Sequence, residues 1–220
     1  MSRALRFSPI SILALASVTW TPLASAQEDI LEEVTVTGSR ASFSTAEDAP
    51  VPVSVLTNEM LTNTGATELG RAIQAAAPSF NFSSSSISDG TDALRPATLR
   101  GLGPDQTLVL INGKRRHTSA LVHVNTSVGR GTAGTDMNAI PISAVKRVEV
   151  LRDGAAAQYG SDAIAGVINI ILKDSATDGI ASLEYGETFE GDGETWVANV
   201  NSGFALGSEG FFNVTYQYRD

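Results

Sequence analysis

One stretch, residues 145–173, constrains the fold of this chain more than any other part of the sequence. It reads VKRVEVLRDGAAAQYGSDAIAGVINIILK, a pattern that predicts a strand, a tight turn, one helical turn, a loop and a second strand. Valines alternate with charged residues in the first strand, which favours one wetter face. Residues 167–172 form an almost continuous apolar run, typical of a strand buried on both faces. A generic buried β-α-β unit would also fit this pattern.

The motif resembles the C-terminal signature of the plug domain of TonB-dependent outer-membrane receptors, whose usual form is ERVEVLRG…YGS.AI.GVINIITK. It departs at Asp153, where the family commonly has glycine, and at Leu172, where threonine is usual. A second stretch, residues 99–113, reads LRGLGPDQTLVLING and is similar to the plug motif IRGLG…VLVLVDG. It predicts a central buried strand followed by a tight turn at Asn112-Gly113. The resemblance implies an α+β plug domain over residues 47–173, with a mixed four-stranded sheet and short helices.

The residues before the second motif fit the first half of such a plug. Residues 51–56 predict a short edge strand, and Thr57 and Thr67 are predicted helix N-caps. Apolar residues at positions 69, 73 and 76 share one helical face, and Pro78 is expected to close that helix. A brief strand at 79–82 and a polar, serine-rich loop are expected next.

Composition limits the classes of function. The formal net charge is −9, and the longest basic cluster, Lys114-Arg115-Arg116, is short. Nucleic acid is therefore not an expected partner, because phosphate binding needs clustered lysine and arginine. The chain has no cysteine, so it has neither disulfide nor thiolate chemistry.

Residues 1–26 have the three parts of a secretory signal peptide. Arg3 and Arg6 supply the positive region, residues 10–20 are mostly apolar, and Ala24-Ser25-Ala26 forms a small-residue cleavage site. We therefore expect the protein to be exported.

Residues 27–46 are acidic and then rich in threonine, serine and alanine, which predicts a flexible segment. Five residues within it resemble the TonB box of the same receptor family: Glu33, Val34, Thr35, Val36 and Thr37. An extended, β-branched segment on a flexible tether can add as a strand to an exposed sheet edge of a partner. The resemblance implies that this partner is the periplasmic domain of TonB.

Arg100 and Arg152 lie beside apolar strands, where an unpaired guanidinium is costly. In the family, the equivalent arginines pair with glutamates of the barrel wall and lock the plug to it. The resemblance implies this role for both residues. The alternative is two ordinary solvated arginines.

Polar loops on either side of the central strand are the remaining candidates for binding. In plugs of this family, the serine-rich loop and the loop after the central strand reach the extracellular side. The resemblance therefore implies ligand contacts from polar residues of these loops: Asn81, Ser83, Asp89, Arg115, Arg116, His117 and His123.

Other kinds of chemistry are weakly represented. The glycines at 129, 131 and 134 satisfy G-x-G-x-x-G, but Pro141 disfavours the helix that a dinucleotide site requires. His117 and His123 lack a fixed third ligand, which favours loop residues over a metal site. No Ser-His-Asp, paired-carboxylate or Cys-His arrangement has a defined spacing. We expect neither an enzyme nor a bound cofactor.

From residue 179 onward the period of the sequence changes to two. Apolar and polar residues alternate over 180–186, 195–201 and 212–219, with aromatic residues in the apolar rows. This alternation is the signature of a transmembrane barrel wall, and a soluble antiparallel meander is the alternative. Plugged transporters have about 22 strands. Residues 179–220 are therefore expected to be the first strands of a longer receptor.

These features together imply a TonB-dependent receptor for active uptake of a scarce ligand, such as a ferric siderophore. The expected location is the Gram-negative outer membrane, with the plug inside the barrel and the N-terminus in the periplasm. TonB, membrane lipid and an extracellular ligand of unknown identity are the expected partners. A soluble periplasmic binding module and a nicotinamide-dependent dehydrogenase are the alternatives.

Overall fold

The fold is known from a computed structural model that describes residues 53–83, 94–124, 128–152, 156–177, 179–208 and 210–220. The predicted signal peptide, the predicted flexible segment with Glu33 to Thr37, and Asp89 lie outside the described residues. All described residues belong to one unit of the chain, residues 31–220.

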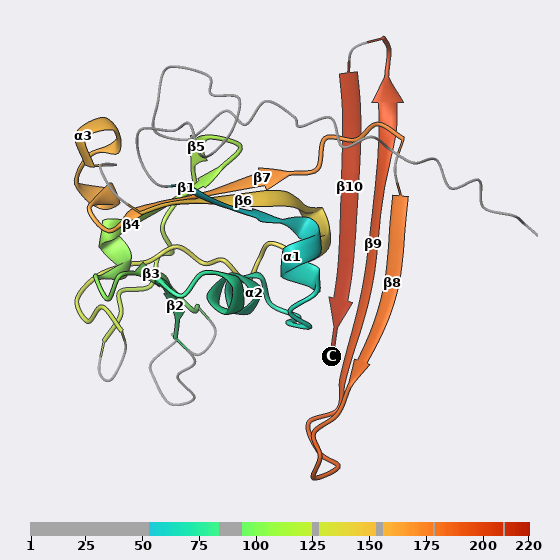
Figure 1. The fold of residues 1–220 in the computed structure, drawn as a ribbon, viewed down its shortest axis with the longest axis horizontal. Coiled ribbons are helices and arrows are strands. Elements are labelled where there is room, and N and C mark those ends of the chain that lie inside the picture. The colour runs from blue at the N-terminus through green and yellow to red at the C-terminus, as the bar shows by residue number, and fades with distance from the viewer. Residues whose placement is uncertain (1–52, 84–93, 125–127, 153–155, 178, 209) are drawn as a thin grey trace, which may run out of the picture. The chain divides into compact units, whose positions relative to one another are not determined.

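A mixed sheet with the strand order β1-β6-β7-β4-β5 organises the first part of the chain (Figure 1). Its strands are β1 (Val53–Thr57), β4 (Thr107–Ile111), β5 (Lys114–Arg115), β6 (Val145–Leu151) and β7 (Gly166–Leu172). β4 and β7 run parallel, whereas the other neighbours are antiparallel. The four longer strands are those of the predicted mixed sheet. The two-residue β5 is added by the Asn112-Gly113 turn, where both residues have positive φ.

Short helices and a second, two-stranded sheet accompany the mixed sheet. The helices are α1 (Asn58–Thr62), α2 (Leu69–Ala76) and α3 (Ala156–Tyr159), with 3₁₀ turns η2 (Pro104–Gln106), η3 (Ile142–Ala144) and η4 (Ser161–Ala163). The second sheet pairs β2 (Phe80–Phe82) with β3 (Ala97–Leu99). Figure 1 shows α2, β2 and β3 on one side of the mixed sheet and α3 on the other.

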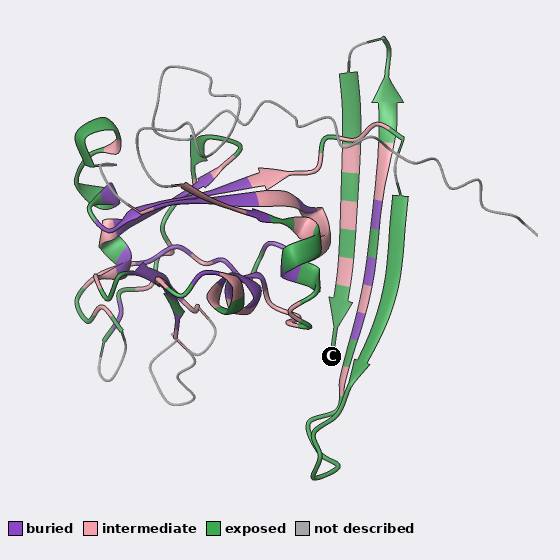
Figure 2. Ribbon diagram, viewed as in Figure 1, coloured by how far each residue is buried: buried purple, intermediate pink, exposed green. Residues whose placement is uncertain are grey.

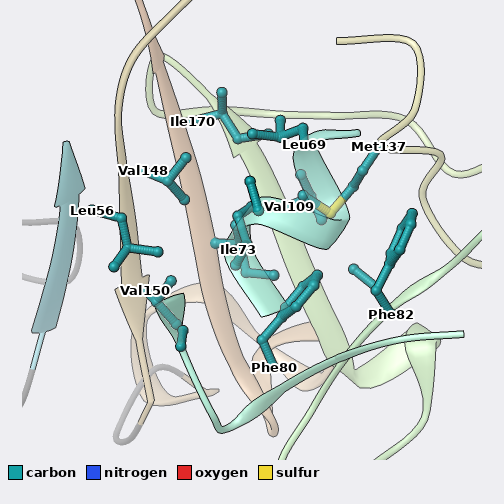
Figure 3. Close-up of a cluster of buried hydrophobic side chains, with 14 of the residues drawn as sticks. Leu56, Leu69, Ile73, Phe80, Phe82, Val109, Met137, Val148, Val150 and Ile170 are labelled. Carbon is teal, nitrogen blue, oxygen red and sulfur yellow. The ribbon is translucent and has the colours of Figure 1, made fainter. Parts of the chain in front are cut away.

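The main core lies between the mixed sheet and the layer of α2 and β2. Figure 3 shows Ile73 of α2 among Val109, Val150 and Phe80, and all four side chains are buried. Each fully buried side chain of this size stabilises the fold by about 1.5–3 kcal/mol. Gly70 lets α2 pack closely against β2, because a Cβ at this position would lie 2.4 Å from the ring of Phe82.

The opposite face of the mixed sheet has a smaller core. Leu108 and Leu110 of β4 pack there with Leu151 and Val167, and Tyr159 of α3 covers part of them. Ile168 and Ile170 of the same strand β7 point into the main core. The expectation that residues 167–172 form a strand buried on both faces is therefore confirmed for its first four residues.

Two local expectations need correction. Thr57 caps α1 as predicted, since its side chain accepts a hydrogen bond from the Met60 amide, but Thr67 does not cap α2. Glu68 is the N-cap instead, and its carboxylate makes no capping bond. The reason is that Arg95, 2.8 Å away, binds this carboxylate.

The wetter face expected for residues 145–151 is also only partly present. Lys146 and Arg147 are half-buried, whereas Glu149 is completely buried. Its carboxylate receives hydrogen bonds from Arg147 Nε at 2.9 Å and Asn169 Nδ2 at 3.1 Å. A buried carboxylate is tolerated because these two donors replace water.

The last three strands form an antiparallel sheet in the order β10-β9-β8, hereafter the β8–β10 sheet. β8 is Gly179–Gly186, β9 is Thr195–Leu206 and β10 is Gly210–Arg219. The predicted alternation is present, and the register places the apolar residues of neighbouring strands opposite each other, as in Tyr185 and Trp196.

The exposure of the two faces of the β8–β10 sheet is the reverse of that in a soluble protein, where apolar side chains are buried and polar ones exposed. The apolar face is open, with Leu183 71% and Tyr216 63% exposed. The amide face is covered along β9, where Asn199 is 8% and Asn201 3% exposed, and Figure 2 shows the resulting alternation along this strand. A soluble meander buries its apolar face instead. This distribution is the one that the alternation expected of a barrel wall predicts.

Candidate functional site

The two arginines singled out in the sequence lie next to each other. Arg100 follows β3 and Arg152 follows β6, yet Arg100 Nη1 donates a hydrogen bond to the main-chain carbonyl of Arg152. Arg152 Nη2 in turn donates to Ser54 Oγ, a residue of β1. Three segments that are distant in the sequence therefore meet at this point. We call these three residues the arginine site.

The backbone at Arg100 is shaped to present its side chain. Arg100 and Gly101 both have positive φ, 56° and 74°, so the chain reverses sharply after β3. The Arg100 amide donates to the Ser79 carbonyl at 2.8 Å, which holds the turn against the segment before β2. Arg100 is exposed as a result, while Arg152 is half-buried.

The charge at the arginine site favours an acidic partner. The Arg100 side chain is bonded to the main chain of Arg152, and within the described residues the buried Nε of Arg152 has no hydrogen-bond partner. A planar guanidinium with a spare donor suits a carboxylate, which can accept two parallel hydrogen bonds.

The candidate ligand contacts do not form one cluster. Asn81 is exposed on β2 and Ser83 is half-buried just after it, whereas Arg115 lies on β5. β5 is an edge strand of the mixed sheet, whereas β2 belongs to the two-stranded sheet on the side of α2 (Figure 1). Asn81 and Ser83 are therefore separated from the residues of β5.

Arg115 is engaged within the fold. It forms an ion pair with Asp162 at 2.6 Å and donates to the Tyr159 carbonyl, so it fastens β5 to the segment of α3 and η4. Arg116 is half-buried and its amide donates to the Val109 carbonyl at 2.9 Å. His117 is exposed.

His123 is buried, 1% exposed, in the loop that follows β5. Its amide and carbonyl bond with Thr132 and Gly131, and Gly134 leaves room for its ring. Nδ1 has no hydrogen-bond partner among the residues described. The glycines at 129, 131 and 134 thus shape this loop, and no helix opens after Gly134.

The described residues contain neither a candidate metal site nor a candidate membrane-spanning helix. No group of three or more histidine, cysteine, aspartate or glutamate side chains in them could hold a metal ion. No helix among those residues has both the length and the apolar character needed to cross a membrane.

Several polar residues that organise the fold had no signal in the sequence. A relay runs from Glu149 through Asn169, whose Oδ1 accepts from the Gly113 amide at 3.0 Å. Glu68 likewise binds arginines that are 27 and 151 residues away. Only the strand register and the three-dimensional fold bring these residues together, so no spacing in the sequence predicts them.

Comparison with known proteins gives a family match over more than half of the chain. The model of the TonB-dependent Receptor Plug Domain matches residues 45–167. A probable TonB-dependent siderophore receptor, PirA of Acinetobacter baumannii, is 31% identical over 194 residues, which are 84% of this chain and 26% of that protein. The vitamin B12 transporter BtuB of Vibrio cholerae is 34% identical over 132 residues, 57% of this chain and 18% of BtuB.

Solved structures show the same likeness. A mutant of the ferric enterobactin receptor PfeA from Pseudomonas aeruginosa, in complex with enterobactin, aligns with a TM-score of 0.61 at 27% identity. The alignment covers 78% of this chain and 25% of that protein. PirA from Acinetobacter baumannii aligns with a TM-score of 0.58 at 26% identity, over 79% of this chain and 25% of PirA. The chain thus spans about a quarter of the length of these relatives.

Proposed function

The chain belongs to the TonB-dependent receptor plug domain family, and from this premise we propose that its gene product is an outer-membrane receptor for active ligand uptake. In this proposal, residues 47–173 are the plug and the β8–β10 sheet begins the barrel wall. Residues 1–26 direct export, and residues 27–46 are a periplasmic tether.

The inverted polarity of the β8–β10 sheet carries this proposal. A row of exposed tyrosine, phenylalanine, leucine and valine side chains would be costly in water. The same row is favourable against lipid, with the amide face turned away from it. A soluble periplasmic binding module has no use for such a row, which disfavours this alternative. A dinucleotide site is disfavoured because no helix begins at Gly134.

The proposed mechanism places the energy source outside the receptor. TonB would add Val34 to Thr37 to the edge of one of its sheets and pull on the tether. Since residues 27–52 lead directly into β1, the pull would reach the mixed sheet at its edge strand. The arginine site would then hold the rest of the plug to acidic residues of the wall.

Siderophores are the ligand class that we propose for this receptor. The support is that relatives matching most of this chain are named as siderophore or ferric enterobactin receptors. We propose that Asn81, Ser83 and the loops around them contact the ligand. Arg115, Arg116, His117, His123 and Asp89 stay in the proposal as secondary candidates.

Deletion of residues 33–38 tests the proposed role of the tether. In the full gene product, we expect the deletion to leave binding of ferric enterobactin to whole cells unchanged and to abolish uptake of its radioactive iron. Deletion of residues 40–45 removes the same number of residues and serves as the control, with uptake retained. Uptake that persists without residues 33–38 would contradict the assignment.

A further inference from the structure

Glu68 stands at a meeting point of three arginines outside the arginine site. Its carboxylate is 12% exposed and lies 2.8 Å from Arg95 Nη1 and 3.2 Å from Arg219 Nη1. Arg71, one turn along α2, approaches to 3.9 Å. A carboxylate so far removed from water needs such partners, because its desolvation is otherwise uncompensated.

The arginines around Glu68 come from separate parts of the fold. Glu68 is the N-cap of α2, and Arg95 lies two residues before β3. Arg219 is the last residue of β10. One carboxylate therefore joins the main helix of the plug, the approach to the small sheet and the third strand of the β8–β10 sheet.

Two other polar contacts between the β8–β10 sheet and the preceding chain are longer. Ser143 Oγ lies 3.4 Å from Asn199 Oδ1, and Asn213 Nδ2 lies 3.4 Å from the Ser175 carbonyl. Both distances are at the outer limit for a hydrogen bond.

The amides on the covered face are occupied mainly within the β8–β10 sheet. Gln217 donates to Asn199 at 2.8 Å, and Asn201 donates to Asn213 at 2.6 Å and to Thr215 at 2.7 Å. A cleft of about 400 Å³ separates part of this face from the plug, lined among others by Asn58, Thr62, Ser143, Ser182, Asn199 and Gln217. Apolar side chains, among them Ile142, Ile180 and Val197, also line this cleft.

From this contrast we propose that Glu68 is a fastening point of the plug on the third wall strand, with Arg219 as its partner. The charges are arranged in the opposite way to those proposed at the arginine site. Here the plug supplies the carboxylate and the wall supplies the guanidinium. The two attachments therefore do not compete for the same groups. The proposal rests on the proposed assignment of β8–β10 to the barrel wall.

A double-mutant cycle on the full gene product, purified in detergent, tests the fastening. The variants are E68Q, R219Q and E68Q/R219Q, and the readout is amide hydrogen exchange in α2 and β10. We expect each single variant to speed exchange in β10 by about three- to tenfold, as for a partly screened ion pair. The double variant should be no faster than E68Q alone.

Variants at neighbouring positions separate fastening from general loss of structure. R95Q removes the other close partner of Glu68, so it should speed exchange in α2 and spare β10. E59Q changes an exposed carboxylate on α1 and should change neither element. A charge swap is less suitable, since an arginine at position 68 would be repelled by Arg95 and Arg71.

The exchange measurement can fail or succeed independently of the proposed function in ligand uptake. Independent, additive effects of E68Q and R219Q on β10 would overturn the fastening, whatever the protein transports. The exchange measurement uses neither TonB nor a ligand. Coupled effects in a protein whose uptake survives deletion of residues 33–38 would leave the fastening in place and remove the uptake mechanism.

Discussion

At the scale of single residues, buried charge is the most consequential feature of this plug. Glu149 lies in the middle of β6 with no exposure, opposite Asn169 of β7. Arg147 neutralises its charge, and Asn169 passes the hydrogen-bond chain on to the turn between β4 and β5. Such a relay specifies the register of three strands, because a slip by one residue would leave a carboxylate alone in the interior.

We predict that Glu149→Ala destabilises residues 47–173 by about 3–5 kcal/mol, because it breaks the ion pair between the buried carboxylate and Arg147. Glu149→Gln should cost less, about 1–3 kcal/mol, since an amide still accepts a hydrogen bond. Urea unfolding followed by circular dichroism measures both, with the exposed Glu59→Gln as the control. If the Ala variant were as stable as the wild type, the hydrogen bonds of Glu149 would not contribute to the stability of the fold.

At the scale of elements, the β8–β10 sheet differs from the other strands of the described residues. Strands of the mixed sheet bury apolar residues, whereas β8 exposes its apolar row along its whole length. β9 has covered amides between exposed apolar residues. Both kinds of strand have a period of two. The apolar row is buried in the mixed sheet, whereas it is exposed in the β8–β10 sheet.

Leu183→Arg tests which face of the β8–β10 sheet meets lipid. Leu183 lies on the open row, and we expect arginine there to cost about 2–4 kcal/mol near the membrane midplane. The amount of heat-modifiable, folded receptor in the outer membrane should fall accordingly. Glu184→Arg puts the same side chain on the other face of β8 and should be tolerated. Equal losses from both substitutions would contradict a lipid-facing row.

At the scale of the whole molecule, the plug and the strands have different requirements. The plug segment has its own core between the mixed sheet and α2, with Leu61, Ile73 and Ile168 fully buried. The β8–β10 sheet has no such core, and its strands β8 and β10 each have one edge without a neighbour in the sheet. Open edges with an apolar face favour association.

We therefore predict that residues 47–173 fold alone as a soluble monomer, whereas residues 47–220 need detergent to stay dispersed. Size-exclusion chromatography with and without detergent micelles compares the two polypeptides directly. The difference is expected because most of the large exposed apolar side chains lie after residue 179. A monomeric 47–220 polypeptide in plain buffer would argue against the division into plug and wall.

Local patterns predicted much of this protein because they reflect short-range physics. The apolar run of β7, the Asn112-Gly113 turn, the Thr57 cap and the alternation after residue 179 depend on nearby residues, and the structure has all four. Arg100 and Arg152 were singled out in the sequence. The hydrogen bond from Arg152 to Ser54 was not predicted, because it depends on β1 pairing with β6. Burial of Glu149, the loss of Thr67 as a cap and the partners of Glu68 were decided by tertiary structure alone. Glu149 and Glu68 each bind a residue at least 20 positions away, and sequence spacing carries no information about such distances.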